Sequence, residues 1–252
     1  MASFIGFLAG EILAFILESL GAVVANFPGG VTALSKLTNP PWWANALGLI
    51  GLWIGFSAAI YFAHHEGRLA MLPNQWRPRA SDLLFIILGV GFQFIIDAAY
   101  EPFHFKSLNH PVNHLFKDTH GAGFLVIAVM TTLLAPFFEE WFFRGVIFRA
   151  IAEGATSMSR RAAVVLGVVV SAVLFGLAHA EALQFVGLFA LGVVLAILVH
   201  RTQRLVPSFV THASFNATAL VAVILQRAGH CCDDCARSGR PFASSTRCWC
   251  SR

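Results

Sequence analysis

The sequence is short of charge, and it has no cysteine before Cys231. Charged residues make up 12% of the 252 residues and hydrophobic residues 57%. A soluble domain carries about twice that charged fraction, so the composition argues against a soluble enzyme. The formal net charge of +4 does not indicate a nucleic-acid partner either, because basic residues of membrane proteins lie in short loops and set the orientation. The partner predicted by composition is the lipid bilayer.

Long apolar segments recur along the chain. Each approaches or exceeds the roughly 20 residues that a helix needs to cross a bilayer core, and lipid offers the backbone no hydrogen-bond partner outside the helix. The sequence therefore predicts an all-α, polytopic transmembrane bundle of about seven helices, formed as one domain by residues 1–227. The predicted helices cover residues 3–25, 42–63, 82–100, 121–152, 162–180, 183–200 and 207–226.

Arginine gathers in the loops after the second, fourth and sixth of these segments. The positive-inside rule places those loops in the cytoplasm, as in a multi-pass protein of the cell membrane. The arginine-bearing C-terminal tail breaks this pattern, so we expect one segment not to cross. Our candidate is the first segment, which carries Glu11 and Glu18 on one face. The arginines of the three loops are Arg68, Arg77, Arg79, Arg149, Arg160, Arg161, Arg201 and Arg204.

The fourth segment carries ionisable residues that an apolar helix ought to exclude. A charged side chain at the bilayer centre costs about 2.5–3.5 kcal/mol on insertion scales and usually finds a partner or lines a cavity. Glu140 and Arg144 lie four residues apart, so they share a helix face and can pair. Glu139 points about 100° away around the helix and is free to hold another group, such as a water.

Two further apolar segments present polar groups at helical spacing. His179 follows Phe175 by four residues near the end of the fifth segment, and His212 precedes Asn216 by four near the start of the seventh. Residues four apart lie on one helix face. Taken singly, each group is better explained as an interhelical staple or a satisfied core residue. Together they predict one site in the bundle core, where helical proteins build theirs.

These motifs, in this order on three hydrophobic helices, resemble the CPBP family of CAAX-processing and bacteriocin-processing intramembrane proteases, which includes the type II CAAX prenyl endopeptidases. The resemblance covers residues 135–219, and no motif position departs from the family pattern. It implies endoproteolysis of a membrane-associated peptide or protein with water as the nucleophile. The motif residues are Glu139, Glu140, Arg144, Phe175, His179, His212 and Asn216.

The resemblance also implies roles for these residues. Glu139 would be the general base, and His179 would share or orient the attacking water. His212 and Asn216 would donate hydrogen bonds to the oxyanion of the tetrahedral intermediate. Arg144 would hold Glu140 in place.

A metal-bound water is an alternative source of the nucleophile. One carboxylate and two histidines, here Glu139, His179 and His212, resemble a catalytic zinc set with an open fourth position. We favour the metal-free version, because a glutamate beside Arg144 is a poorer metal ligand. Two alternatives lie outside catalysis: an immunity or scaffold protein of the same family that acts by binding, and a proton-coupled transporter that uses the same ionisable groups as a relay.

The single site makes a geometric demand. If the fifth and sixth segments both cross fully, His179 and His212 lie near opposite ends, roughly 25 Å apart at 1.5 Å per residue. We therefore predict short, tilted or sunken helices there. Side chains of His179 and His212 more than about 12 Å apart could not share a site through one water.

Two polar regions are interpreted as lying outside this site. The histidine-rich loop after residue 100, with His104, His110, His114 and His120, could hold a metal but better fits a solvated hairpin. The tail, residues 228–252, holds all five cysteines and is predicted to be a disordered appendage. A zinc knuckle, disulfides or acylation remain alternatives for these cysteines, and Trp249 at the fourth position from the end excludes a prenylation signal.

Overall fold

The computed structural model describes residues 2–37, 39–65, 69, 75–103, 115–116, 119–155 and 157–237, and within these every regular element is helical. The prediction of an all-α bundle is confirmed, since seven helices are long and apolar enough to cross a membrane. The protein is therefore an integral, multi-pass membrane protein. The elements are α1 (Ala2–Val24), α2 (Gly30–Leu34), α3 (Trp42–His65), η1 (Ala80–Leu83), α4 (Leu84–Tyr100), η2 (Glu101–Phe103), α6 (Gly121–Val129), η3 (Met130–Leu134), α7 (Ala135–Glu139), η4 (Glu140–Phe148), α8 (Arg149–Gly154), α9 (Arg160–Ala178), α10 (Phe185–Thr202) and α11 (Val206–Arg237).

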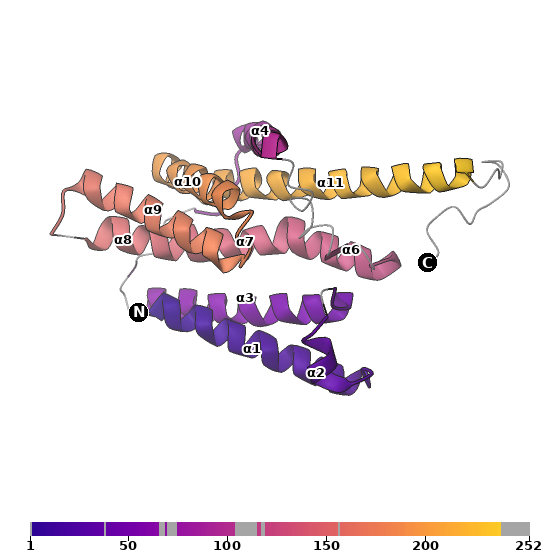
Figure 1. The fold of residues 1–252 in the computed structure, drawn as a ribbon. Coiled ribbons are helices and arrows are strands. Elements are labelled where there is room, and N and C mark those ends of the chain that lie inside the picture. Colours follow the sequence, from indigo (N-terminus) through magenta and orange to yellow (C-terminus); the bar gives the residue numbers. More distant parts are fainter. Residues whose placement is uncertain are drawn as a thin grey trace.

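The helices form layers around one long central helix, which is built from α6, η3, α7, η4 and α8 (Figure 1). The paired helices α1 and α3 lie along one side of it, and α11 runs along the opposite side. Helix α9 folds back along the η4 end, and α10 returns beside α9 to the start of α11. Helix α4 packs across α11 and is seen nearly end-on in Figure 1. This arrangement places the fourth, fifth and seventh spans in mutual contact.

Helix α1 packs closely along α3 through small residues. A side chain at Gly55 would meet the backbone of Gly6 and Gly10, and one at Gly48 would meet the carboxylate of Glu18. Small residues let the backbones of two membrane helices approach each other in this way. Residues 6–24 are long and apolar enough to span, so the expectation that the first segment fails to cross finds no support in its length or packing.

The central helix is longer than one crossing requires. Residues 121–154 form a 34-residue span, about 50 Å long at the rise of an α-helix. Two parts of it, η3 and η4, are π-helical. The π-helix is rare, occurs mostly as short segments inside α-helices, and is frequent at functional sites. The hydrophobic pattern predicted the helix but not these two segments.

The first π-helical segment, η3, precedes a proline within the span. The N–H of Ala135 bonds to the carbonyl of Met130, five residues back. In the same register the carbonyl of Thr131 would take its hydrogen bond from residue 136, which is a proline without an N–H. The side-chain amide of Asn216 on α11 donates to the Thr131 carbonyl instead, at 2.9 Å. Pro136 therefore leaves the carbonyl of Thr131 without a backbone donor. The hydrogen bond that this carbonyl accepts from Asn216 joins the fourth and seventh spans.

Aromatic residues fill the space between α3 and the central helix. The rings of Trp53 and Phe138 stack 5.0 Å apart, and those of Phe56 and Phe142 stack 4.2 Å apart. Such pairs add about 0.5–1.5 kcal/mol beyond their buried area. Because lipid gives no hydrophobic drive to helix association, close packing of this kind holds the spans together.

An ion pair fixes the start of α4 against the loop before α11. Both terminal nitrogens of the Arg204 guanidinium donate to the carboxylate of Asp82, at 2.6 and 2.8 Å, and one of them also donates to the carbonyl of Arg77. The N–H of Arg79 donates to the same carboxylate at 2.7 Å. The hydrogen bonds to Asp82 raise the pKa of Arg204. Arg204, which the sequence marked only as a loop charge, is a structural residue.

Substitution of Asp82 by asparagine tests this ion pair. Loss of the carboxylate leaves the buried Arg204 without its counter-charge. We therefore expect the free energy of unfolding to fall by about 3 kcal/mol and Tm in detergent to fall by several degrees. Asp97→Asn, on the adjoining helix α4, is the matched control, because Asp97 is exposed and its carboxylate accepts from the amide of Gln93 rather than from a buried cation. Equal Tm values for both variants would contradict the assignment.

The two outlying regions are only partly described. His104, His110 and His114 lie outside the described residues. Helix α11 continues past residue 227 to Arg237, so it extends beyond the predicted domain boundary and includes Cys231. The part of the predicted tail that follows residue 237 lies outside the described residues.

Candidate active site

The carboxylate of Glu140 forms the polar centre of the bundle. Glu140 begins the π-helical segment η4 and is completely buried. One of its oxygens accepts from Arg144 at 2.8 Å and from Nδ1 of His212 at 3.0 Å, and the other accepts from the hydroxyl of Ser208. The predicted pairing of Glu140 with Arg144 is present. A buried carboxylate needs such a set of donors to stay ionised.

The guanidinium of Arg144 is also completely buried. Besides Glu140, it donates to the carbonyl of Gly192 on α10 at 3.3 Å. It lies over the ring of Phe175, 4.4 Å from the ring centre, as a cation–π contact. A side chain at residue 192 would press on Arg144 and on Ala172. The guanidinium of Arg144 on η4 therefore contacts both α9 and α10 and holds the three helices together.

His212 lies between the two adjacent glutamates. Its Nδ1 faces Glu140, and its Nε2 lies 3.7 Å from a carboxylate oxygen of Glu139. Because an ionised carboxylate can only accept, Nδ1 of His212 must carry a proton. Glu140 thereby fixes the orientation and the tautomer of this imidazole. Glu139 itself keeps 13% of its side chain exposed, whereas Glu140 has none.

His179 approaches the same place from the end of α9. Its Nδ1 lies 2.8 Å from the carbonyl of Phe175, which can only accept, so Nδ1 carries the proton and Nε2 is left to accept one. The ring of Phe175 lies 4.8 Å from the His179 ring and 5.3 Å from the His212 ring. The two imidazole centres are thus no further apart than the sum of these distances, which is below the limit of about 12 Å.

Phe175 is the hub of this arrangement. It is completely buried, and it contacts Arg144, His179 and His212. His179 follows the last turn of α9, and α11 passes beside that turn. The fifth span therefore needs no unusual length to bring His179 to the site. Asn216, one turn beyond His212, shares the same helix face and is held by its bond to Thr131.

The proposed zinc set does not fit these side chains. Zinc holds its ligand atoms about 2.0–2.2 Å from one point, so three ligands must converge. Among the described residues, no group of three His, Cys, Asp or Glu side chains has such an arrangement.

Part of the chain matches a known protein family. Residues 121–218 match the family model described as Type II CAAX prenyl endopeptidase Rce1-like. This segment is similar to that family. The resemblance predicted from the motifs is confirmed, and the Rce1-like segment runs from the start of α6 into α11, enclosing every predicted site residue. Rce1-like proteins form a protease family, which supports an intramembrane endopeptidase at the level of the family. The comparisons with curated proteins and with solved structures give no match.

Sequence reasoning missed Ser208, although its position offered a signal. Ser208 lies four residues before His212 on α11, so the two share a helix face, and its hydroxyl donates to the buried Glu140 carboxylate. We expect Ser208→Ala to lower the free energy of unfolding by about 1.5–3 kcal/mol, because the Glu140 carboxylate loses a charge-assisted hydrogen bond. The measurement is Tm in detergent. In the control Ser214→Ala, a hydroxyl that donates to the carbonyl of Val210 is removed, and a Tm loss as large as that of Ser208→Ala would count against this role.

Proposed function

We propose that this protein is an intramembrane endopeptidase that cleaves a membrane-tethered peptide with a water activated by Glu139. The observation that carries the proposal is the convergence of Glu139, Glu140, His179 and His212 around Phe175. A structural staple requires only Glu140 and Arg144. It does not require a second, less buried carboxylate facing the ring of His212.

Glu139 removes a proton from the water, and Nε2 of His179 accepts a hydrogen bond from the same water and orients it. The water oxygen then attacks the peptide carbonyl. The developing oxyanion receives hydrogen bonds from Nε2–H of His212 and from the second N–H of the Asn216 amide, since the first is held by Thr131. Preorganised donors of this kind are each worth about 2.7–4 kcal/mol.

The other buried groups act through His212. When Nε2 of His212 carries a proton, the ring is a cation, and Glu140 stabilises it through Nδ1. Arg144 and Ser208 hold Glu140 in the position that this requires. Glu140 is therefore a positioning residue in the proposal, and Glu139 is the base. Once the tetrahedral intermediate collapses, the proton taken by Glu139 passes to the leaving amine.

The test is cleavage of a library of membrane-tethered peptides, with and without a prenyl group, by purified protein in proteoliposomes. We expect product with wild type and none above background with His179→Ala. Cleavage of prenylated members alone would narrow the substrate class to prenylated peptides. Wild type that makes no product above background would exclude an endopeptidase and favour a binding protein. Equal product from wild type and His179→Ala would exclude the proposed role of His179.

Metal removal gives a separate expectation. Because the described side chains form no three-ligand group, we expect a strong chelator to change the rate of cleavage less than about two-fold. A catalytic zinc site would lose its activity completely under the same treatment and regain it on adding zinc. The measurement is the initial rate before and after dialysis against chelator, with added zinc as the return control.

A further inference from the structure

The loop that carries His179 is held by a tyrosine from another helix. Residues 179–184 connect α9 to α10, and His179 is the first of them. The hydroxyl of Tyr100, the last residue of α4, donates to the carbonyl of Leu183 at 2.9 Å. The same hydroxyl accepts from the backbone N–H of Gly187 at 3.1 Å. Tyr100 therefore binds the loop at the point where it enters α10.

Tyr100 also caps the N-terminus of α10. The first N–H groups of a helix have no intrahelical acceptor. The side chain of Gln184, which precedes α10, makes no capping bond within the described part of the chain. Gly187 is the third residue of α10, and the N–H at this position is one that a capping oxygen usually satisfies. The hydroxyl of Tyr100 thus takes the place of the missing capping side chain.

The α9 end of the same loop is tightly folded. Ala180 has a φ of 53°, in the left-handed region, which is unfavourable for a residue with a side chain. Such a conformation persists only where surrounding contacts impose it. On one side, the N–H of Ala180 bonds to the carbonyl of Leu177 at 3.0 Å. On the other side, the contacts that hold the loop are the two hydrogen bonds of Tyr100, so the place of His179 depends on both ends.

Helix α4 contacts the helix of the second imidazole as well. A side chain at Gly89 would meet the carbonyl of Thr211, the residue before His212. Gly89 and Tyr100 lie on one continuous helix. Helix α4 therefore packs against α11 beside His212 and, at its other end, holds the loop of His179. It links the two elements whose imidazoles must share one site.

We propose that Tyr100 is a positioning residue that holds His179 in place through the loop. This inference rests on the proposed function, in which Nε2 of His179 orients the attacking water. A displacement of about 1 Å at a catalytic group can lower a rate about 10²-fold. Because the water is oriented only for the chemical step, loss of the Tyr100 hydroxyl should lower kcat and leave KM nearly unchanged.

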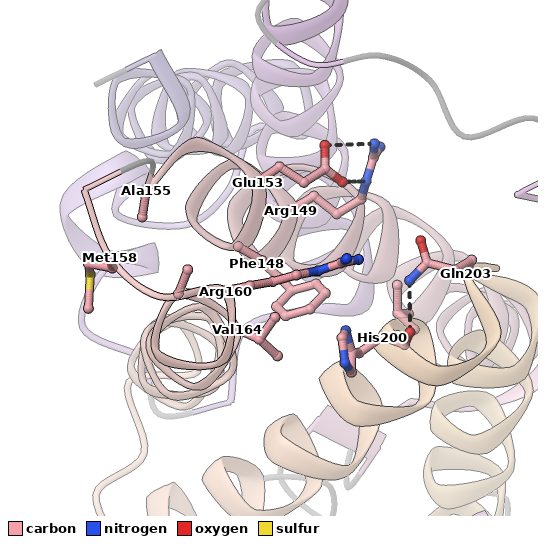
Figure 2. Close-up of a pocket in the computed structure, with 12 residues that line it drawn as sticks. Phe148, Arg149, Glu153, Ala155, Met158, Arg160, Val164, His200 and Gln203 are labelled. Carbon is pink, nitrogen blue, oxygen red and sulfur yellow. Dashed lines mark hydrogen bonds and ion pairs between the residues drawn. The ribbon is translucent and has the colours of Figure 1, made fainter.

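The experiment compares Tyr100→Phe with two controls in proteoliposomes, well below the Tm of each variant. Tyr100→Phe keeps the ring and removes both hydrogen bonds, and we expect kcat to fall at least about ten-fold with KM changed less than about two-fold. Tyr61→Phe makes the same chemical change at a residue that is 58% exposed. Gln203→Ala removes a bond to the carbonyl of His200 at the opposite end of α10 (Figure 2). Both controls should cleave as wild type does.

Amide hydrogen exchange adds a measurement that does not depend on activity. The N–H of Gly187 should exchange at least about ten-fold faster in Tyr100→Phe than in wild type, because its acceptor is lost. It should be unchanged in Gln203→Ala.

The outcomes separate this inference from the proposed function. Product from wild type, with an equal kcat for Tyr100→Phe, would overturn the positioning role and leave the endopeptidase intact. A kcat loss of the same size in Gln203→Ala would mean that any weakening of α10 slows cleavage, and it would also overturn the role. No product from wild type would exclude the endopeptidase, and the role of Tyr100 with it, even if Gly187 exchanges as expected.

Discussion

Replacing Glu139 by glutamine should abolish peptide cleavage while leaving the fold intact. Glutamine keeps the shape of the side chain but cannot take a proton from water, and a positioned general base contributes about 10²–10⁴-fold. We expect kcat to fall by at least about 10²-fold, with KM changed little, because the carboxylate is needed only as the water attacks. The measurement is the initial rate of cleavage in proteoliposomes.

Tm separates this effect from unfolding. Glu139 keeps part of its side chain exposed, and it comes no closer than 3.7 Å to Nε2 of His212, so Tm should change by less than about 2 °C. Glu101→Gln, at the exposed end of α4, is the control and should cleave as wild type does. Full activity of Glu139→Gln would show that another group activates the water.

The membrane fold could be predicted from sequence because lipid leaves the chain few choices. Each apolar segment of sufficient length becomes a helix, and the structure places the fourth helix at Gly121–Gly154 and the fifth at Arg160–Ala178, close to the predicted bounds. Hydropathy could not predict the π-helical segments. In these segments the backbone N–H bonds to the carbonyl five residues back instead of four. This shift leaves the pattern of apolar residues in the sequence unchanged.

The contacts within one helix could be read from spacing, whereas those between helices could not. The pairing of Glu140 with Arg144 follows from their separation of four residues. The bond between Glu140 and His212 joins residues on different helices. The family order of motifs predicted a shared site for these residues but not this bond. The partnership of Asp82 with Arg204 had no signal at all, because two loop-end charges far apart in sequence can meet only after the helices pack.

The predicted distance conflict between His179 and His212 arose from treating the spans as parallel rods. In the structure His179 follows the last turn of α9, and Phe175 one turn earlier contacts both imidazoles. His212 lies in the second turn of α11, and this turn passes beside the last turn of α9. The hydrophobic pattern predicts the lengths of the helices but not which turns of neighbouring helices meet.

The buried pair of Glu140 and Arg144 should separate stability from catalysis. Glu140→Gln leaves a completely buried guanidinium without its counter-charge, so we expect a loss of about 3–5 kcal/mol and no activity. Arg144→Met should cost less, because His212 and Ser208 still donate to the Glu140 carboxylate. Measured by Tm, the double variant should recover most of the stability lost in Glu140→Gln, since no buried charge is left unpaired.

Cleavage should not recover with stability. In the double variant no carboxylate faces Nδ1 of His212, so the cationic form of the ring that stabilises the oxyanion is lost even though the helices repack. The control is Glu153→Gln. It breaks the Glu153–Arg149 pair, four residues apart on the same continuous helix, but with half of the Glu153 side chain exposed. That pair should contribute about 0.3–0.5 kcal/mol. Additive losses in the double variant would mean that Glu140 and Arg144 are not coupled, and the positioning of His212 would then need another explanation.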